Sequence, residues 1–298
     1  MLLACVGGLE AAGRALYPVP ALPPPLVFDA QTGWALPPHH RSTMNNVQLR
    51  TNSLGLRGHE PVLDRPVTRA MVLGDSSAYG WMVAEEQSFA GRLEALGGAG
   101  LDVQNGGVPG FTCPQSRALY QRVLPTAPPD ILVVYSLTSD KRMASAGDWP
   151  LAEPVFGPLG LVGMGRLASQ VSLRLRAARD APLSSLRLYR ACMDDLVSEQ
   201  RARGGQVVLV VPLTVDGIAP PPGQDEDHGE PVALHDRYVA VLEDLSQRQG
   251  VPLLDCSELA AGTAPNDLLL DNVHPNARGH ALIADALHRL LREQGWLQ

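Results

Sequence analysis

Residues 131–137 read Ile-Leu-Val-Val-Tyr-Ser-Leu, a continuous apolar run typical of a strand buried on both faces of a sheet. Further short strands are predicted at residues 69–73, 101–105, 206–211 and 251–254. Amphipathic stretches are predicted as helices at residues 86–96, 113–124, 183–203, 234–249 and 276–294. Strands alternating with helices predict an α/β fold, a three-layer sandwich around a five-stranded parallel sheet.

Three segments are predicted along the chain. Residues 1–27 form an N-terminal segment that ends in a stiff linker, because five prolines fall within residues 17–27. Residues 28–68 show no clear periodicity and are predicted to be an irregular extension packed on the main domain. Residues 69–298 form that main domain.

The N-terminus allows two interpretations. Residues 8–16 suit a short amphipathic helix, and Leu2-Leu3-Ala4-Cys5 loosely resembles a lipoprotein processing site. The first interpretation is an ordinary helix in a cytoplasmic protein. The second is the end of a membrane anchor or signal that precedes residue 1, which implies the cell envelope or periplasm.

Composition excludes several kinds of binding site. The net charge is −7, which argues against a nucleic-acid partner, and Lys141 is the only lysine, which excludes a Walker-type phosphate loop. The four cysteines, at positions 5, 113, 192 and 256, form no C-x-x-C pair and favour isolated thiols. His39 and His40 are predicted to be a solvated pair. His280 and His288 are predicted to face outward or to cap a helix. No metal or cofactor is expected.

In a parallel α/β sheet, ligands bind outside the carboxyl ends of the strands. The first loop at that edge contains Gly74-Asp75-Ser76-Ser77, directly after the strand at residues 69–73. A serine hydroxyl there is a poor nucleophile unless a base accepts its proton. Taken alone, Gly-Asp-Ser is equally typical of a turn or a helix cap.

The last loop reads Leu270-Asp271-Asn272-Val273-His274-Pro275, just before the final helix. The carboxylate of Asp271 can accept the Nδ1–H of His274, which leaves Nε2 to take a proton from Ser76. Each residue alone is equally consistent with a helix cap or a surface histidine. Together, on the same sheet edge, they predict a catalytic triad of Ser76, Asp271 and His274.

These motifs resemble the SGNH (GDSL-type) hydrolases. Gly74-Asp75-Ser76-Ser77 is similar to their first block, Asp271-x-x-His274-Pro275 to their last, and residues 105–110 to their glycine block. The resemblance covers residues 69–298 and also reaches residues 52–58, which are similar to a stretch upstream of the serine in membrane-anchored bacterial members. It implies a flavodoxin-like fold and a bacterial serine esterase with Ser76 as nucleophile. It also implies an oxyanion hole formed by Ser76, Gly107 and Ser139.

One block departs from the family pattern. Ser139, in Leu137-Thr138-Ser139-Asp140, stands where the family has an asparagine that donates to the oxyanion. A serine hydroxyl is shorter and rotatable, so it is a less preorganised donor. Three alternatives follow: a slower esterase, a shifted donor such as Thr138, or a degenerate domain that binds without turnover.

The predicted function is hydrolysis of a carboxylic ester through an acyl-enzyme at Ser76. An O-acyltransferase with the same triad remains an alternative, because the first half-reaction is the same. The expected partner is a small-molecule, carbohydrate or lipid ester. The stretch between Lys141 and Pro182 suits either a partly apolar lid or an ordinary surface insertion.

Overall fold

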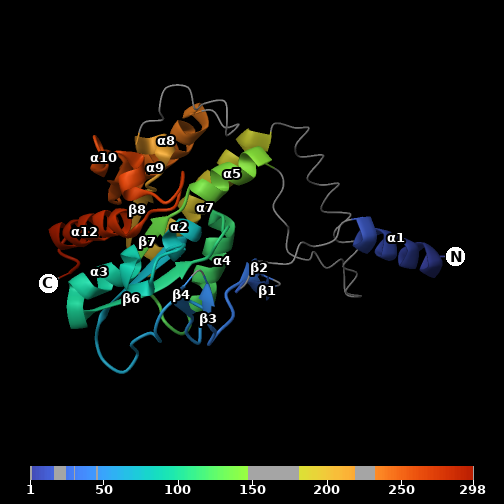
Figure 1. The fold of residues 1–298 in the computed structure, drawn as a ribbon, viewed down its shortest axis with the longest axis horizontal. Coiled ribbons are helices and arrows are strands. Elements are labelled where there is room, and N and C mark those ends of the chain that lie inside the picture. Colours follow the sequence, from blue (N-terminus) through green and yellow to red (C-terminus); the bar gives the residue numbers. More distant parts are fainter. Residues whose placement is uncertain are drawn as a thin grey trace.

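The computed structural model of the chain describes residues 2–16, 25–29, 31–44, 46–146, 181–218 and 232–297. Its centre is a sheet with the strand order β6-β5-β7-β8-β9 (Figure 1), in which all neighbouring strands are parallel. The strands are β5 (Thr68–Gly74), β6 (Leu101–Gly107), β7 (Ile131–Tyr135), β8 (Gln206–Val211) and β9 (Leu253–Asp255). The predicted five-stranded parallel sheet is confirmed.

Helices cover both faces of the sheet, because side chains of each strand alternate between two hydrophobic cores. Val72 and Val133 lie in one core with the helices α3 (Phe89–Gly97) and α12 (Ala277–Glu293). Met71 and Leu132 lie in the other core. The helices on that second side are α4 (Cys113–Val123), α7 (Ala181–Ala202) and α9 (Val232–Gln249).

The remaining helices lie in connections or at the start of the chain. They are α1 (Leu2–Leu16), α2 (Ser76–Tyr79), η1 (Glu85–Gln87), η2 (Gly98–Gly100), α5 (Thr138–Ala146), α8 (Val215–Ile218), α10 (Cys256–Leu259) and α11 (Pro265–Leu268). Among the described residues, no helix combines the length and apolar character that a membrane crossing needs. Most of the predicted lid or insertion, residues 147–180, lies outside the described residues.

The strand order identifies where a ligand site is expected. From β5 the chain passes to β6 on one side and then to β7 on the other. The carboxyl end of β5 is therefore a topological switch point, the place where open α/β sheets bind ligands. Gly74, the last residue of β5, pairs with Gly107 on one side and Tyr135 on the other.

The N-terminal extension is more regular than the sequence predicts. It contains two antiparallel hairpins, β1 (Val27–Asp29) with β2 (Gly33–Ala35) and β3 (Arg41–Met44) with β4 (Val47–Arg50). Strands of three or four residues are too short to show an alternating pattern, which is why the sequence suggested an irregular segment. Trp34, Leu36 and Leu56 are buried in the same core as Met71, so the extension packs on the main sheet.

The predicted outward-facing position of His280 is wrong. Its side chain is fully buried, its Nδ1 accepts the Phe89 N–H at 3.2 Å, and its ring stacks on the Phe89 ring. Burial lowers the pKa of His280 to about 3, so the ring is neutral. His280 lies on the same face of α12 as the buried Ile283, Ala284 and Leu287, and His288 is half-buried.

The prediction of four isolated thiols is wrong for two cysteines. Cys113, at the start of α4, and Cys192, within α7, form a disulfide, and both are buried. They are 79 residues apart, so no local spacing in the sequence indicates the pair. Cys5 is an exposed free thiol and Cys256 a buried one.

Loss of this disulfide is expected to lower the free energy of unfolding by about 4 kcal/mol, because it restricts a long loop in the unfolded chain. The urea midpoint of the wild type should fall after treatment with dithiothreitol. The Cys113→Ala/Cys192→Ala variant should start at the lower midpoint and not respond to the reductant. Cys256→Ala is the matched control, which should respond like the wild type. Equal midpoints with and without reductant would show that the bond contributes nothing.

Candidate active site

The loop after β5 passes directly into a short helix that begins at Ser76. Asp75 caps this helix, and its Oδ1 accepts the Ser77 N–H at 3.0 Å. Gly74 has a φ of +156°, and a Cβ at this position would lie 2.1 Å from the Tyr135 carbonyl oxygen. Only glycine therefore allows the sharp exit from the strand that brings Ser76 to the sheet edge.

The loop before α12 is fixed by hydrogen bonds within itself. Asp271 Oδ1 accepts the N–H groups of Val273 and His274, each at 2.9 Å. Leu270 N–H donates to the His274 carbonyl at 2.8 Å, which joins the two ends of the loop. The Asp271 carboxylate and the His274 ring are therefore held in one rigid turn.

The two loops meet at the sheet edge. His274 Nε2 lies 2.8 Å from Ser76 Oγ, and His274 Nδ1 lies 2.7 Å from Asp271 Oδ2. A proton on Nδ1 satisfies both contacts, because the ring then donates to Asp271 and accepts from the Ser76 hydroxyl. Ser77 Oγ also donates to the Val273 carbonyl at 2.8 Å, which ties the loops together next to these contacts.

The geometry brings together all three residues that the sequence predicts as a triad. A comparison with protein-family models matches residues 72–282 to the GDSL-like lipase/acylhydrolase family. The chain belongs to this family. It is a hydrolase that acts on ester bonds. No curated protein sequence matches this hydrolase.

Solved structures show the same fold at low sequence identity. An α/β hydrolase from the metagenome of Lake Arreo, Spain, is 21% identical, with a TM-score of 0.53 over 78% of this chain and 98% of that one. An acetylxylan esterase from Geobacillus stearothermophilus is 19% identical, with a TM-score of 0.52 over 78% of this chain and 97% of that one. Both therefore span most of the main domain of this GDSL-like hydrolase.

The two acidic residues of the site have pKa values shifted in opposite directions. Burial alone would raise the pKa of Asp271, but the hydrogen bonds from the His274 ring and from the backbone of Val273 and His274 outweigh it, and the pKa is lowered. Burial raises the pKa of Asp75, although hydrogen bonds from Ser77 and Ser139 oppose the rise. Asp271 is therefore ionised at neutral pH, as a partner for an imidazolium must be.

Apolar side chains lie on both loops that meet at the site. The Trp81 ring lies beside the His274 ring, with centroids 6.1 Å apart. Met82 and Leu270 are exposed large hydrophobic residues, one on each of the two loops that meet at the site. Each of the two loops therefore exposes a large apolar side chain.

The predicted oxyanion residue Gly107 has a different task in the structure. Its N–H donates to Asn105 Oδ1 at 2.9 Å. A Cβ at Gly107 would lie 2.3 Å from the Tyr79 nitrogen, so the missing side chain allows α2 to pack on β6. The N–H of Gly107 is therefore already engaged within the protein.

The hydroxyl of Ser139 is also engaged. Ser139 Oγ donates to Asp75 Oδ2 at 3.0 Å, and the Ser139 N–H donates to the same oxygen at 3.1 Å. Both groups are buried and hold the carboxylate that caps helix α2. The structure thus connects Ser139 to Asp75, a link that no spacing in the sequence indicates.

Two backbone N–H groups at the sheet edge have no acceptor among the described residues. One belongs to Ser76, the first residue of α2, whose N–H has no partner within the helix. The other belongs to Gly110, a buried residue with a φ of +79° in the turn after β6. A buried N–H without an acceptor is rare in proteins, so these groups are available to a ligand atom. The glycine-rich stretch at residues 105–110 is the only sequence signal that points to Gly110.

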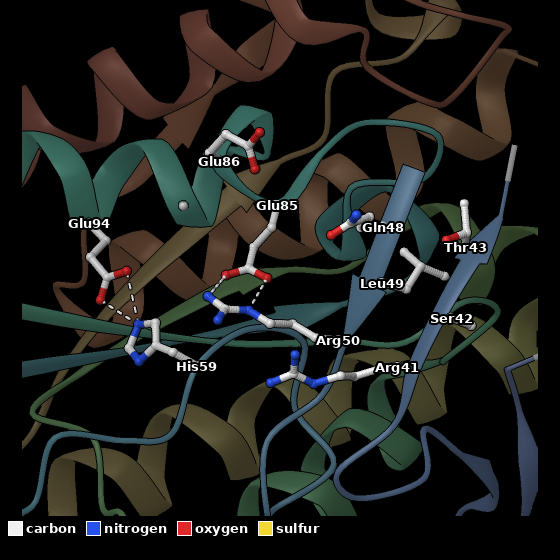
Figure 2. A pocket seen from close by; sticks show the side chains of 11 residues that line it. Arg41, Ser42, Thr43, Gln48, Leu49, Arg50, His59, Glu85, Glu86 and Glu94 are labelled. Atoms are coloured by element: carbon white, nitrogen blue, oxygen red, sulfur yellow. Dashed lines mark hydrogen bonds and ion pairs between the residues drawn. The ribbon is translucent and has the colours of Figure 1, made fainter. Parts of the chain in front are cut away.

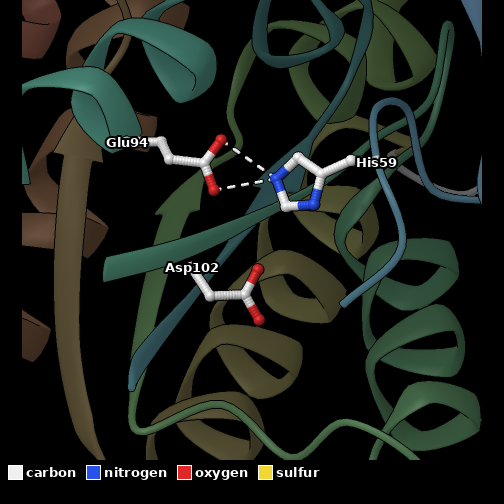
Figure 3. Close-up of side chains that lie close together, drawn as sticks. All are labelled: His59, Glu94 and Asp102. Atoms are coloured by element: carbon white, nitrogen blue, oxygen red, sulfur yellow. Dashed lines mark hydrogen bonds and ion pairs between the residues drawn. The ribbon is translucent and has the colours of Figure 1, made fainter. Parts of the chain in front are cut away.

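One cluster outside the site contains residue types that bind metals (Figure 3). Ligand atoms of His59, Glu94 and Asp102 lie within 4.8 Å of one another. Each has protein partners: His59 Nε2 contacts Glu94 Oε1 at 2.8 Å, and Arg69 Nε donates to Asp102 Oδ2 at 2.8 Å. The hydrogen bond that His59 donates to Glu94 raises the pKa of His59 to about 9, so this cluster is an ion-pair network that joins the extension to α3 and β6.

A polar pocket of about 680 Å³ lies between the extension and α3 (Figure 2). Arg41 and Arg50 project into it from the β3–β4 hairpin, opposite Glu85 and Glu94. Its lining includes none of the residues Ser76, Asp271 and His274. The pocket is therefore separate from the place where Ser76, His274 and Asp271 meet.

Proposed function

We propose that Ser76, His274 and Asp271 are the catalytic triad with which this protein hydrolyses a carboxylic ester through an acyl-enzyme. The observation that carries the proposal is the chain of contacts from Asp271 Oδ2 through the His274 ring to Ser76 Oγ, at 2.7 and 2.8 Å. A hydroxyl within hydrogen-bond reach of a base, itself oriented by a carboxylate, is the arrangement of an activated serine nucleophile.

The reaction proceeds in two halves. Ser76 Oγ attacks the ester carbonyl while its proton passes to His274 Nε2, which gives a tetrahedral oxyanion. As the intermediate collapses, the C–O bond to the alcohol breaks and His274 returns the proton to the leaving oxygen. Water then attacks the acyl-enzyme with His274 as base and releases the acid. Asp271 stabilises the imidazolium in both halves.

The oxyanion is stabilised by the N–H groups of Ser76 and Gly110. This assignment keeps Ser76 and replaces Gly107 and Ser139 with Gly110, because the N–H groups of Ser76 and Gly110 have no acceptor among the described residues. Fixed backbone donors need no reorganisation when charge develops on the carbonyl oxygen, and each is worth about 3 kcal/mol of transition-state stabilisation. Gly110 has a positive φ, a backbone conformation that glycine adopts readily, and it carries no side chain next to its N–H.

Hydrolysis of 4-nitrophenyl acetate and 4-nitrophenyl butyrate tests the function. Acetyl esters are the first choice because one structural neighbour acts on acetylxylan. The purified chain should release nitrophenol from at least one of the two esters with saturation kinetics. A folded protein that turns over neither ester, nor acetylated xylo-oligosaccharides, would contradict the proposal and favour a binding domain.

Ser139→Ala is expected to change kcat by less than about fivefold, because its hydroxyl donates to Asp75 and not to the oxyanion. The free energy of unfolding should fall by about 1–2 kcal/mol, since a buried carboxylate loses one of its donors. Ser116→Ala is the matched control, because the buried Ser116 Oγ on α4 has no hydrogen-bond partner among the described residues. A loss of about 100-fold or more in kcat for Ser139→Ala would identify the serine as a working oxyanion donor.

A further inference from the structure

Arg57 is a buried cation in the segment of residues 52–58, upstream of the catalytic main domain. Its side chain is almost inaccessible to solvent. Its backbone N–H donates to the Asn105 carbonyl at 3.0 Å, which adds the segment to the edge of β6. The Arg57 backbone is thus anchored to the sheet next to the loop that follows Ser76.

The guanidinium of Arg57 binds three carbonyl oxygens of that loop. Nη1 donates to Tyr79 O and Gly80 O, and Nη2 donates to Val83 O, each at 2.7 Å. The guanidinium carbon also lies 4.6 Å from the centroid of the Tyr79 ring. A Cβ at Gly80 would lie 2.9 Å from Nη1, so this glycine makes room for the guanidinium.

Burying this charge costs free energy, which indicates that Arg57 serves to position the residues it binds. No carboxylate among the described residues forms an ion pair with Arg57, and its Nε has no hydrogen-bond partner there. Burial consequently lowers the pKa of Arg57 below its ordinary value. A buried cation bound to carbonyls alone is an expensive way to add stability, but it fixes the geometry of those carbonyls.

The loop held by Arg57 carries a wall of the active site. Trp81 lies between the bound carbonyls of Gly80 and Val83, and its ring lies beside that of His274. Met82, next to it, has a φ of +64°, an unfavourable backbone conformation for a residue with a side chain. Such a conformation persists only where the surroundings enforce it, and the hydrogen bonds on both sides of residues 81–82 supply that enforcement.

The second contact between the extension and this region lies just beyond the loop. Arg50 donates from Nε and Nη2 to the two carboxylate oxygens of Glu85, at 2.8 and 2.6 Å (Figure 2). This pair is half-exposed, so it is a weaker restraint than the buried contacts of Arg57. Arg57 is therefore the principal link between the extension and the active-site loop.

We propose that Arg57 is a positioning residue that fixes the loop at residues 79–83 so that Trp81 forms the wall against which the alcohol part of the ester lies. The inference rests on the proposed function. His274 must return its proton to the leaving oxygen, so the alcohol part of the ester departs next to the His274 ring. Trp81 lies at that ring, and its position therefore determines which alcohols fit.

The test compares two acetate esters that differ in the alcohol, benzyl acetate and ethyl acetate. The readout is the ratio of their kcat/KM values, which does not change if a variant only lowers the amount of folded enzyme. Trp81→Ala should lower the benzyl-to-ethyl ratio by about tenfold, the scale on which a lost apolar contact changes specificity. Arg57→Gln should lower it to a similar extent, and the double variant should show no further loss.

Arg69→Gln is the matched control. Arg69 also links the extension to the sheet, through Asp102 and the Val62 carbonyl, but it has no contact with residues 79–83. This variant should leave the benzyl-to-ethyl ratio within about twofold of the wild type. Arg57→Lys retains a cation that can reach part of the carbonyl set, and it should restore part of the ratio. If Arg57→Gln does not fold, the benzyl-to-ethyl ratio of Arg57→Lys tests the positioning role instead.

A ratio that is unchanged in the folded Arg57 variants while Trp81→Ala lowers it would overturn the positioning role. So would additive losses in the double variant. An unchanged ratio in Trp81→Ala would overturn the assignment of the alcohol wall. Failure of the proposed function is a different result: Ser76→Ala would then retain hydrolysis of both esters, whatever the ratios.

Discussion

Replacing Ser76 by alanine is expected to lower kcat for ester hydrolysis by about 10⁴–10⁶-fold, as removal of the nucleophile does in other triad hydrolases. Without Oγ no acyl-enzyme can form, and the His274 ring loses the hydroxyl that lies 2.8 Å from its Nε2. The fold should survive, because the Ser76 side chain is only half-buried and helix α2 is capped by Asp75. Circular dichroism and thermal unfolding measure the fold, and a 4-nitrophenyl ester assay measures the loss.

Ser77→Ala is the matched control for this variant. Ser77 is adjacent, but its hydroxyl donates to the Val273 carbonyl and cannot reach His274 Nε2 while that contact persists. We expect Ser77→Ala to lower kcat far less than Ser76→Ala, through looser docking of the two loops. Activity of the Ser76→Ala protein within tenfold of the wild type would exclude Ser76 as the nucleophile.

Asp271→Asn is expected to lower kcat by about 10³–10⁴-fold with the fold intact. The asparagine can still accept the backbone N–H groups of Val273 and His274, so the loop should keep its shape. An amide NH₂ at the position of Oδ2 cannot accept the Nδ1–H of His274. The ring then carries its proton on Nε2, the tautomer that cannot accept the Ser76 proton. The imidazolium of the transition state also loses its negative partner.

Asp267→Asn offers a control in the same region. Asp267 is an exposed carboxylate in α11, and this variant removes the same charge without contacting His274. Its kcat should remain within about twofold of the wild type, which excludes a general effect of charge. Equal activities of the two asparagine variants would rule out Asp271 as the orienting carboxylate.

The sheet and the three converging residues were predictable because their signals are local. The run of apolar residues at 131–137 marks a buried strand, and residues 69–73 and 206–211 carry similar runs. Ser76 directly follows such a strand, and Asp271 and His274 are three residues apart before the last helix. The rule that parallel strands present their carboxyl ends at one edge then places the loops together.

Features that depend on distant contacts were not predictable. The pairing of Cys113 with Cys192 depends on how α4 packs on α7, and their spacing in the chain does not encode it. The Ser139 hydroxyl donates to Asp75, 64 residues away in the chain, so this link forms only in the folded protein.

The burial of His280 is a different case, because a local signal was present. Ile283, Ala284 and Leu287 follow it at helical spacing and mark a buried face of α12. For Arg57 the sequence signal was present, because residues 52–58 resemble a stretch upstream of the serine in family members. Its three carbonyl partners, however, follow only from the fold.

Covalent labelling with a fluorophosphonate, read by peptide mass spectrometry, tests the central claim most directly. The reagent forms a stable adduct only with a serine whose hydroxyl is activated by a neighbouring base. The account predicts one adduct per chain, on Ser76, which forms much more slowly in His274→Ala. An adduct on any other serine, or equal labelling rates in the wild type and His274→Ala, would contradict it.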